Sequence, residues 1–474
     1  MTDALHTTRS SDSADGIADG PKDNAVSARP VPAAPGRLPL IGHTWTLWKA
    51  ARQGGLYPYL TGLADAGPLL RLDIPTAPMV VVTDPDLAWQ VMVAQGGAFE
   101  KGMLYTKMAP LVGSGLATAD GPTHRRHRRM VQPAFHRSAI AGYARTMSEH
   151  ALAMADSWQP GQILDVDQAT AALAVDTLAA TLFDADIGRA AADVVRADVP
   201  VILRHMLVRA ALPRAMDRLP LTAHREFDAA TARLRAVIDQ VVSAARADSR
   251  PPGLDLLSLL MAARDEDTAE GFTDSEIRDE LMTILFAGSD TSGSTLAWAL
   301  HELAAHPEAE ERLHAEVDEV VGRGGAVTAA DVPRLEQTRR IVEETLRLHS
   351  VTMLMRRTLR PVTLGGHLLP AGTEVAYSLY ALMRHRRHFP GPDRFDPERW
   401  GEARRREIPR EAQLAFGAGA RKCIGDTFAM TEMTIALATV AARWRLRPAP
   451  GPEPRPVMAA MPLPDRVRMR VEAR

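Results

Sequence analysis

Phe416-Gly-Ala-Gly-Ala-Arg-Lys-Cys-Ile-Gly425 is the stretch that decides how this sequence is interpreted, because it holds the only cysteine among 474 residues. Cys423 follows Arg421 and Lys422 and lies one residue short of a helix that is predicted over 425–444. Amides at a helix N-terminus and neighbouring cations both favour a thiolate. The glycines let the backbone pass close to a flat, bulky group. The segment therefore predicts a ligand-binding thiolate rather than a small buried apolar side chain.

The composition of the chain disfavours several classes of protein. Lysine and arginine number 56 against 58 for aspartate and glutamate, a formal net charge of −2, and aromatic residues make up 5%. A nucleic-acid-binding protein needs a basic face or stacking rings. One cysteine forms neither an intrachain disulfide nor a multi-thiolate zinc site. With no signal-peptide pattern and no apolar run of about 18 residues, we expect a soluble, cytoplasmic enzyme without a membrane anchor.

The chain is predicted to form one folded domain behind a disordered N-terminal tail. Residues 1–34 are rich in Ser, Asp, Ala and Gly and end in a proline-rich stretch, a composition that buries little apolar surface. Length alone suggests about three domains at ~150 residues each. No linker or repeat interrupts residues 35–474, however, so we expect a single catalytic domain there.

Hydrophobic patterning predicts a mainly α-helical fold with small β-sheets. The apolar runs Leu69–Leu72 and Met79–Thr83 favour a strand pair. Residues 84–321 are dominated by helical patterns rich in Ala, Leu, Arg and Glu. Short strands are expected over 358–376, followed by a long irregular stretch over 384–413.

One helix is predicted to be long enough to cross the whole domain. It begins at the capping box Thr273-Asp-Ser-Glu276 and continues to about His306, after which Pro307 begins another helix. Pro333 is expected to open a further helix. Ala287-Gly-Ser-Asp-Thr-Ser292 lies in the middle of the long helix, although Gly, Asp and Ser are poor helix formers. Three such residues together in a buried helix indicate a functional site.

The spacing of Phe416, Gly419, Arg421, Cys423 and Gly425 resembles the haem-thiolate signature F-x-x-G-x-R-x-C-x-G of the cytochrome P450 family. The resemblance extends from about residue 35 to the C-terminus and implies the cytochrome P450 fold. It implies haem b as cofactor, with Cys423 as the iron ligand and with Phe416, Arg421 and Gly425 in the cofactor site. It also implies O2 as co-substrate and electrons that come indirectly from NAD(P)H.

The mid-helix segment matches the family pattern A-G-x-[DE]-T-[TS] at every position. By that likeness Ala287 belongs to the oxygen-binding site and Gly288 makes room for oxygen above the iron. Asp290 and Thr291 are implied to relay protons to the oxygen that is being activated.

The resemblance also assigns residues to the haem propionates. His124 and Arg128 lie four apart in a basic run, where bacterial members of the family place a propionate-binding pair. Arg421 and Arg356 are further candidates, and the adjacent Arg357 leaves the choice between 356 and 357 open.

Glu344, Arg347 and Arg399 are implied to form the family's buried charge triad beneath the haem loop. The i, i+3 spacing of Glu344 and Arg347 places both on one helical face. This role is structural rather than catalytic, and such a triad holds only if every charge is paired.

The resemblance implies a monooxygenase that inserts one atom of O2 into an unactivated C–H bond. A peroxide-driven peroxygenase and a non-enzymatic haem sensor are the alternatives. The intact pair Asp290 and Thr291 disfavours both, because neither of those proteins needs a proton relay of this kind.

Three segments are implied to line the substrate pocket, namely Met103–Leu111, Ser350–Met355 and Met458–Leu463. They are rich in methionine and almost uncharged, which suits a compact hydrocarbon. The stretch from Gly121 to Tyr143 is similar to actinobacterial oxygenases that act on sesquiterpenes. A terpene of antibiotic or other secondary metabolism is therefore the expected substrate, with fatty acids and macrolides as alternatives.

Electrons are expected to come from separate partner proteins. Gly417-Ala-Gly419 lacks the features of a nucleotide-binding loop, and no βαβ pattern precedes it. The resemblance implies a ferredoxin and a ferredoxin reductase, or a flavodoxin-type protein, that serve a monomeric enzyme. Their expected docking face is the basic surface around Arg125, Arg126 and Arg129.

Overall fold

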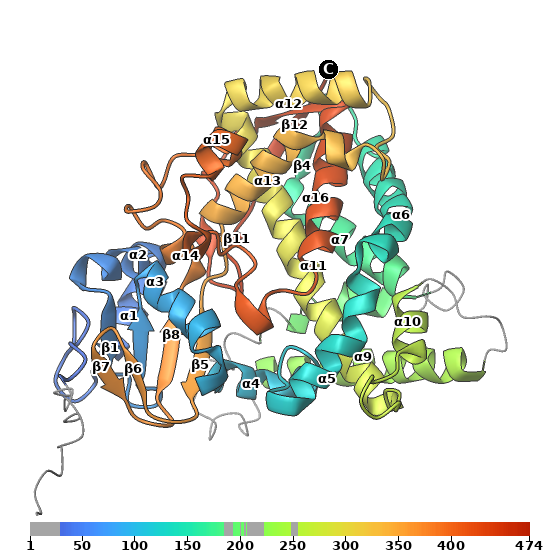
Figure 1. Ribbon diagram of the computed structural model, residues 1–474. Helices are drawn as coiled ribbons and strands as arrows, with labels where there is room; N and C mark the ends of the chain where they lie inside the picture. Colours follow the sequence, from blue (N-terminus) through green and yellow to red (C-terminus); the bar gives the residue numbers. More distant parts are fainter. Residues whose placement is uncertain (1–28, 184–192, 200, 203–204, 206–221, 248–254) are drawn as a thin grey trace, which may run out of the picture.

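The computed structural model describes residues 29–183, 193–199, 201–202, 205, 222–247 and 255–474. A large helical body lies beside a smaller lobe that is built around a β-sheet (Figure 1), which confirms the predicted fold class. The helices are α1 (Thr44–Arg52), α2 (Leu56–Ala66), α3 (Pro85–Trp89), α4 (Met103–Val112), α5 (Gly121–Val131), α6 (Arg137–Asp156), α7 (Val166–Leu182), α9 (Thr222–Ala247), α10 (Leu256–Ala262), α11 (Asp274–Ala305), α12 (Pro307–Val320), α13 (Glu336–Leu348), α14 (Leu379–Leu382), α15 (Glu402–Arg405) and α16 (Asp426–Ala441). The strands are β1 (Leu69–Leu72), β2 (Met79–Val82), β3 (Phe99–Lys101), β4 (Ile163–Asp165), β5 (Leu354–Thr358), β6 (Val362–Leu364), β7 (His367–Leu369), β8 (Glu374–Tyr377), β9 (Trp444–Pro448), β10 (Pro456–Val457), β11 (Leu463–Pro464) and β12 (Arg468–Ala473).

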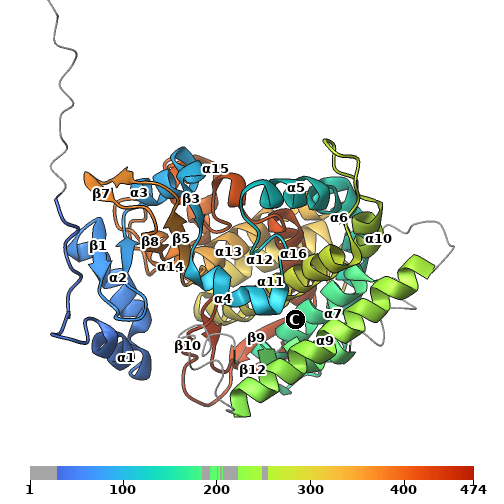
Figure 2. The same cartoon turned by 90° about the horizontal axis from the view of Figure 1, so that it is seen from below.

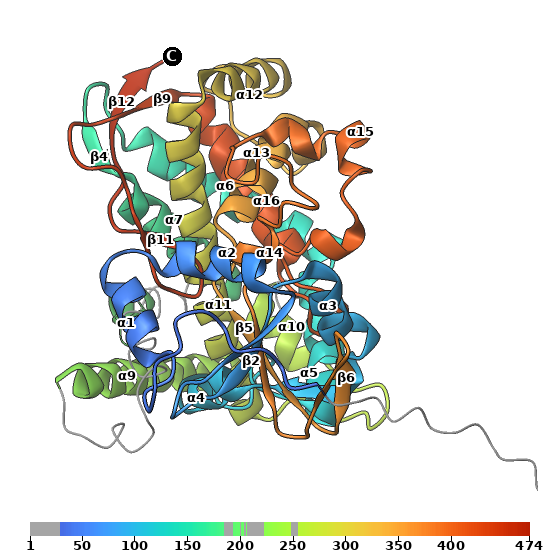
Figure 3. The ribbon, with the colours of Figure 1, turned by 90° about the vertical axis from the view of Figure 1, so that its left-hand side faces the viewer.

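The main sheet of the smaller lobe joins distant parts of the chain. Strands β1 and β2 pair in antiparallel fashion, as their apolar runs predicted. The sheet continues in the order β1-β2-β8-β5-β3, so that N-terminal strands lie beside strands from the last third of the chain (Figure 3). The register of its β3–β5 edge places Lys101 opposite Arg356. Two cations from distant segments therefore meet at the side of the lobe that faces the helical body.

The long helix α11 forms the centre of the helical body and packs against α7, α9, α13 and α16 (Figure 1). Its predicted start is confirmed, because Thr273 and Glu276 form a complete capping box. It spans 32 residues, about 48 Å at ~1.5 Å per residue, and ends before His306, where Pro307 begins α12. Its middle is buried among the helices that surround it.

Three predicted boundaries were wrong by a few residues. Pro333 lies in a 3-10 turn, and α13 begins only at Glu336. The α13 start is fixed by tertiary contact, since the carboxylate of Glu316 on α12 accepts hydrogen bonds from the amides of its first turn. The last helix is α16, which ends at Ala441 and leaves Trp444 to begin β9. Val467 immediately precedes β12 rather than forming part of it.

The predicted N-terminal tail, residues 1–34, extends too far into the folded part of the chain. Residues 1–28 lie outside the described residues, but residues 29–34 do not. The amide of Ala34 donates to the carbonyl of Arg71, whose own amide donates to Pro32, and Ala34 is buried. Val31 packs against the apolar core beside the sheet. These residues are part of the folded lobe.

Within the described part of the chain, no helix combines the length and the apolar character that a bilayer span requires.

Candidate active site

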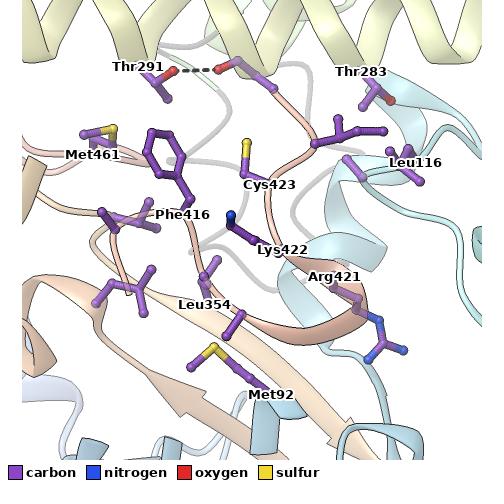
Figure 4. A pocket seen from close by; sticks show the side chains of 18 of the residues that line it. Met92, Leu116, Thr283, Thr291, Leu354, Phe416, Arg421, Lys422, Cys423 and Met461 are labelled. Atoms are coloured by element: carbon purple, nitrogen blue, oxygen red, sulfur yellow. Dashed lines mark hydrogen bonds between the residues drawn. The ribbon is translucent and has the colours of Figure 1, made fainter. Parts of the chain in front are cut away.

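A cavity lies between α11 and the loop that carries Cys423. It has a volume of about 340 Å³. Ala287 and Thr291 of α11 line one wall, and Phe416 and Cys423 line the opposite one. The sulfur of Cys423 points toward α11 and the hydroxyl of Thr291 lies across from it (Figure 4). The fold therefore brings the cysteine motif and the mid-helix motif together across one space.

The cysteine loop is held by glycine and by one backbone hydrogen bond. The amide of Cys423 donates to the carbonyl of Phe416 at 2.9 Å, which closes the loop. Gly419 has φ +71°, and a Cβ there would lie 2.3 Å from the carbonyl oxygen of Met92. Only glycine meets both conditions. Gly425 is the N-cap of α16, so two residues rather than one separate Cys423 from the helix.

The expectation that the protein itself favours a thiolate was wrong. Burial raises the pKa of Cys423, although the Gly425 amide and the cations Arg128 and Lys422 act in the opposite direction. Arg421 turns away and donates to Asp120. The thiol is open to the cavity, yet protein surrounds it elsewhere, so desolvation outweighs the nearby positive charges. A metal cation bound at the sulfur would supply the missing stabilisation.

Gly288 does not face the cavity. A Cβ at this position would lie 2.8 Å from Leu178 of α7, and Gly293 is crowded by the α7 backbone in the same way. The two glycines let α11 and α7 pack closely. The structure gives Gly288 a packing role against Leu178 of α7, and Gly288 is not among the residues that line the cavity.

The two polar residues of the mid-helix motif occupy different surroundings. Thr291 lines the cavity and its hydroxyl donates to the carbonyl of Ala287 at 2.9 Å. Asp290 does not line the cavity, and among the described residues its carboxylate has no hydrogen-bond partner. Burial raises the pKa of Asp290 to about 6. Its carboxyl group therefore exchanges a proton close to neutral pH.

Glu432 of α16 is a buried acid that sequence reasoning missed. It is 3% exposed, and burial raises its pKa to about 8, although a hydrogen bond with Ser292 acts against this. Its Oε1 atom has no partner among the described residues. Ser292 itself lines the cavity. A protonated carboxyl group therefore lies one hydroxyl away from the cavity wall.

A cluster of basic side chains lines one edge of the cavity. The predicted candidates His124, Arg128, Arg356 and Arg421 all lie there, together with Lys101, which the sequence analysis did not single out. Burial and the neighbouring cations lower the pKa of His124 to about 4, and burial lowers that of Lys101 to about 7. No aspartate or glutamate is among the described residues that line the cavity.

Arg356 and Arg357 point in different directions, and of the two only Arg356 lines the cavity. Arg357 turns outward and pairs with Glu374 at 2.7 Å and Glu100 at 3.5 Å. Arg356 is buried at the cavity, one Nη1–H bonded to the Met355 carbonyl, and its Nε has no acceptor among the described residues. A buried guanidinium with a free donor is costly unless a ligand accepts from it.

The predicted charge triad forms, and it lies away from this cavity. It consists of Glu344, Arg347 and Arg399. All three are buried, and the two Glu344 oxygens accept from Arg347 Nη2 and Nε at 2.8 and 2.9 Å. Arg399 Nε donates to the same carboxylate at 3.4 Å, and Trp400 Nε1 donates at 2.8 Å. Backbone carbonyls accept the remaining guanidinium donors.

The methionine-rich lining was only partly correct. Each of the three expected segments contributes to the cavity, through Tyr105, through Val351 and Leu354, and through Met461. The methionines Met103, Met353 and Met355 instead pack into the apolar core between the sheet and α2.

The expected partner surface is largely engaged within the chain. Arg126 pairs with Glu276 at 2.7 Å, and Arg129 pairs with Asp265 and Asp267 at 2.9 and 2.6 Å. Arg125 is exposed. Two of the three arginines are thus occupied by ion pairs of their own.

The lining fits a flat, apolar group that carries two carboxylates and a metal ion. Its walls are apolar, a single sulfur ligand faces the space, and an excess of cations with a free Arg356 donor lies at one edge. Iron protoporphyrin IX has these properties. Cys423 would bind the iron, and the basic cluster would bind the propionates.

Comparison with known proteins agrees with this fit. The cytochrome P450 family model matches residues 32–468. The chain is 40% identical to the cyclooctat-9-en-7-ol 5-monooxygenase of Streptomyces melanosporofaciens, covering 90% of this chain and 92% of that protein. It is 34% identical to the pentalenene oxygenase of Streptomyces avermitilis, covering 93% and 97%. The crystal structure of the cytochrome P450DA haem domain is 28% identical and covers 94% of this chain and 98% of that one, with a TM-score of 0.84. This chain belongs to the cytochrome P450 family.

Proposed function

We propose that this haem-thiolate monooxygenase oxidises a compact terpenoid hydrocarbon, such as a sesquiterpene, in bacterial secondary metabolism. The observation that carries the proposal is the cavity between Thr291 and Cys423. Its walls are mainly apolar, and α11 places the acid Asp290 and the hydroxyl of Thr291 beside it. Its substrate-facing side chains include Leu116, Val351 and Met461. Relatives at 34% and 40% identity are named for oxidation of pentalenene and cyclooctat-9-en-7-ol. Fatty acids and macrolides remain the alternatives.

The haem supplies the activation of O2 and the transfer of one oxygen atom to carbon, with electrons that redox partners deliver. The residues of the chain do the remaining work. Lys101, His124, Arg128, Arg356 and Arg421 would hold the propionates, and Cys423 would bind the iron. The apolar lining excludes water and orients the substrate by shape.

We propose that Asp290 and Thr291 deliver protons. Burial raises the pKa of Asp290 to about 6, so its carboxyl group can take up and release a proton near neutral pH, and Thr291 places a hydroxyl at the cavity surface on the next position of the same helix. Both are needed because Asp290 does not itself line the cavity. A peroxide-driven enzyme and a haem sensor have no use for this pair.

The test of the proton relay is product formed per NADPH consumed, with hydrogen peroxide measured in parallel. Thr291→Ala should retain haem and reduction but release much of its electron supply as peroxide, and Asp290→Asn should slow turnover by ~10²–10⁴-fold. The matched control is Thr295→Ala, because Thr295 also lines the cavity and donates to a carbonyl four residues earlier. Full coupling in Thr291→Ala would refute the relay.

The axial ligand and substrate class are tested by absorption spectra. The reduced, CO-bound protein should show the Soret band of thiolate ligation, and Cys423→His should move it to that of imidazole ligation. Terpene hydrocarbons should shift the Soret band of the resting enzyme more strongly than fatty acids or macrolides. A response to fatty acids alone would replace the terpenoid proposal.

For electron supply we propose a ferredoxin and its reductase, docking behind the cysteine loop. A second cavity of about 300 Å³ opens there, lined by Arg405, Arg410 and Lys422. Charge steering to such a face weakens as salt rises. Lys422→Glu should therefore lower the rate of reduction by the partner more than Arg129→Glu does. Equal effects of the two substitutions would instead favour the originally expected docking face on α5.

A monomeric state and a cytoplasmic location remain predictions, and we propose that the catalytic domain includes residues 29–34 as well as 35–474. Sedimentation of the purified chain tests the monomeric state.

A further inference from the structure

A group of apolar side chains stands exposed at the outer end of the smaller lobe. We call it the N-terminal apolar patch, and it consists of Leu38, Leu40, Ile41, Trp45 and Trp48. Their exposed fractions are 37%, 99%, 45%, 50% and 46%. Trp45 and Trp48 stack with ring centroids 4.6 Å apart. Exposed apolar side chains are ordinary when single, but five of them within eleven consecutive residues, two of them stacked tryptophans, point to an interaction site.

The helix that carries the two tryptophans of the patch lies on the molecular surface. Helix α1 has no buried residue. It lies at the margin of the molecule, on the side away from the helical body (Figure 2). An amphipathic helix normally buries its apolar face against its own domain. The apolar face of α1 is instead available to a partner outside the chain.

The turn before α1 is held in a strained conformation that points Leu40 into solvent. Leu38 and Gly42 exchange two backbone hydrogen bonds, at 2.8 and 3.0 Å. Leu40 lies between them with φ +65°, a conformation unfavourable for a side chain of this kind. The turn is fixed to the sheet because the amide of His43 donates to the carbonyl of Asp73 at 2.8 Å. The fold thus maintains strain and exposes a leucine almost completely, which has no value for stability.

The sequence segment that carries the patch contains basic but no acidic side chains. No aspartate or glutamate occurs between Arg29 and Ala64, although the whole chain has more acidic than basic residues. Lys49 and Arg52 lie on α1, and the Arg52 guanidinium stands 4.9 Å from the ring centroid of Trp48. Arg37 is also nearby but pairs with Asp73. The patch is therefore bordered by cations that have room for an anionic partner.

We propose that the N-terminal apolar patch seats the protein on the surface of an anionic phospholipid bilayer. Tryptophan, leucine and isoleucine would enter the boundary between headgroups and acyl chains, while Lys49 and Arg52 meet the anionic headgroups. Indole rings prefer this boundary because one edge is apolar and the other donates a hydrogen bond. This is a reversible surface contact and involves no spanning helix.

A protein partner or a second copy of the chain fits the patch less well. A stable protein interface takes about 20–30 residues from each side, whereas this patch is one protruding turn and one nine-residue helix. A protruding patch can enter a bilayer, because the lipid surface is mobile and needs no matching concave shape. The inference rests on the exposed residues alone and stands whether or not the proposed substrate is correct.

The experiment is sedimentation of the full-length, haem-loaded protein with sucrose-filled vesicles. Vesicles of phosphatidylcholine with about one quarter phosphatidylglycerol should bind the protein, and vesicles of phosphatidylcholine alone should bind it at least about tenfold more weakly. The double variant Trp45→Ser/Trp48→Ser and the variant Leu40→Ser should each lose about tenfold or more in affinity. Lys49→Glu/Arg52→Glu should lose most of the preference for anionic vesicles.

The matched control is Ile163→Ser, which removes a similarly exposed apolar side chain, 43% exposed, from β4 in the helical body. It should bind vesicles like the unchanged protein. Since α1 buries no residue, the patch variants should keep their haem spectrum and melting temperature, which separates loss of binding from misfolding. Equal binding of patch variants and unchanged protein, or equal binding to neutral vesicles, would overturn the proposal. A dimer that patch substitutions dissociate, without vesicle binding, would assign the patch to self-association instead.

Discussion

Two groups of buried arginines in this protein have opposite electrostatic surroundings. In the network of Glu344, Arg347 and Arg399, each guanidinium donor has an acceptor, either the carboxylate or a backbone carbonyl. In the cluster around Arg356 and Lys101, no carboxylate is among the described residues that line the cavity, and the Arg356 Nε has no acceptor. One group is complete within the chain and the other is not.

The difference separates residues that stabilise the fold from residues that bind a ligand. Burying a charge is costly, and a complete network recovers that cost from its own partners. An incomplete network recovers it only when a ligand brings the missing negative charge. The burial of an arginine therefore indicates a structural or a ligand-binding role only when the acceptors of its hydrogen-bond donors are counted as well.

The largest effect is expected when the complete network is broken. Glu344→Ala leaves two buried guanidinium groups without their carboxylate and should lower the free energy of unfolding by about 3–5 kcal/mol. Urea denaturation measures this. The control is Glu336→Ala on the same helix, whose exposed pair with Arg340 should contribute less than about 1 kcal/mol. Equal losses in the two variants would contradict the comparison.

A smaller and different effect is expected from the incomplete cluster. Arg356→Leu should leave the stability of the haem-free chain unchanged or higher, since it removes an unsatisfied buried donor. It should weaken haem binding by about 1.5–3 kcal/mol, roughly 10- to 150-fold, because it removes a charged hydrogen bond to a propionate. Transfer of haem to an acceptor protein measures the affinity. Arg357→Leu, which changes the exposed neighbour, should retain haem normally, and a similar loss there would undo the assignment.

The third effect depends on pH and concerns a buried acid that has no cationic partner among the described residues. Burial raises the pKa of Glu432 to about 8 from its ordinary value near 4.5, so the folded chain holds a proton that the unfolded chain releases in this window. Stability should therefore fall as pH rises from about 5 to 8, by at most about 1.4 kcal/mol per pH unit. Glu432→Gln cannot ionise and should lose this slope. Unfolding curves at pH 5, 6, 7 and 8 measure it, and parallel pH profiles for both proteins would show that Glu432 is ionised when folded.

Local signals in the sequence were sufficient for the fold class, the capping box at Thr273 and the location of the cavity. The cysteine motif and the mid-helix motif each contain residues whose spacing is improbable by chance. The pair His124 and Arg128 was found through the family resemblance, and its i, i+4 spacing places both side chains on one face of α5. These features are encoded in neighbouring residues, so a single sequence is enough to find them.

The features that were missed depend on residues far apart in the chain. Lys101 is a lone lysine at a strand end and becomes part of the site only because β3 pairs with β5. Glu432 follows no motif, and only its burial against α11 makes it unusual. The position of Gly288 depended on α7, whose Leu178 occupies the space beside it. The pKa of Cys423 required knowing that burial outweighs nearby charge.

The order of strands in the main sheet also bears on how the chain is made. Glu100 of β3 meets Arg357 of β5, which lies 257 positions later in the sequence. At ~5–20 residues per second on the ribosome, about 13–50 s separate the synthesis of these two partners. During that interval β1 and β2 can pair with each other, but the edge of β2 that joins β8 in the finished sheet is open to other chains. A chaperone at the ribosome should therefore raise the yield of soluble protein more than later addition of haem precursor.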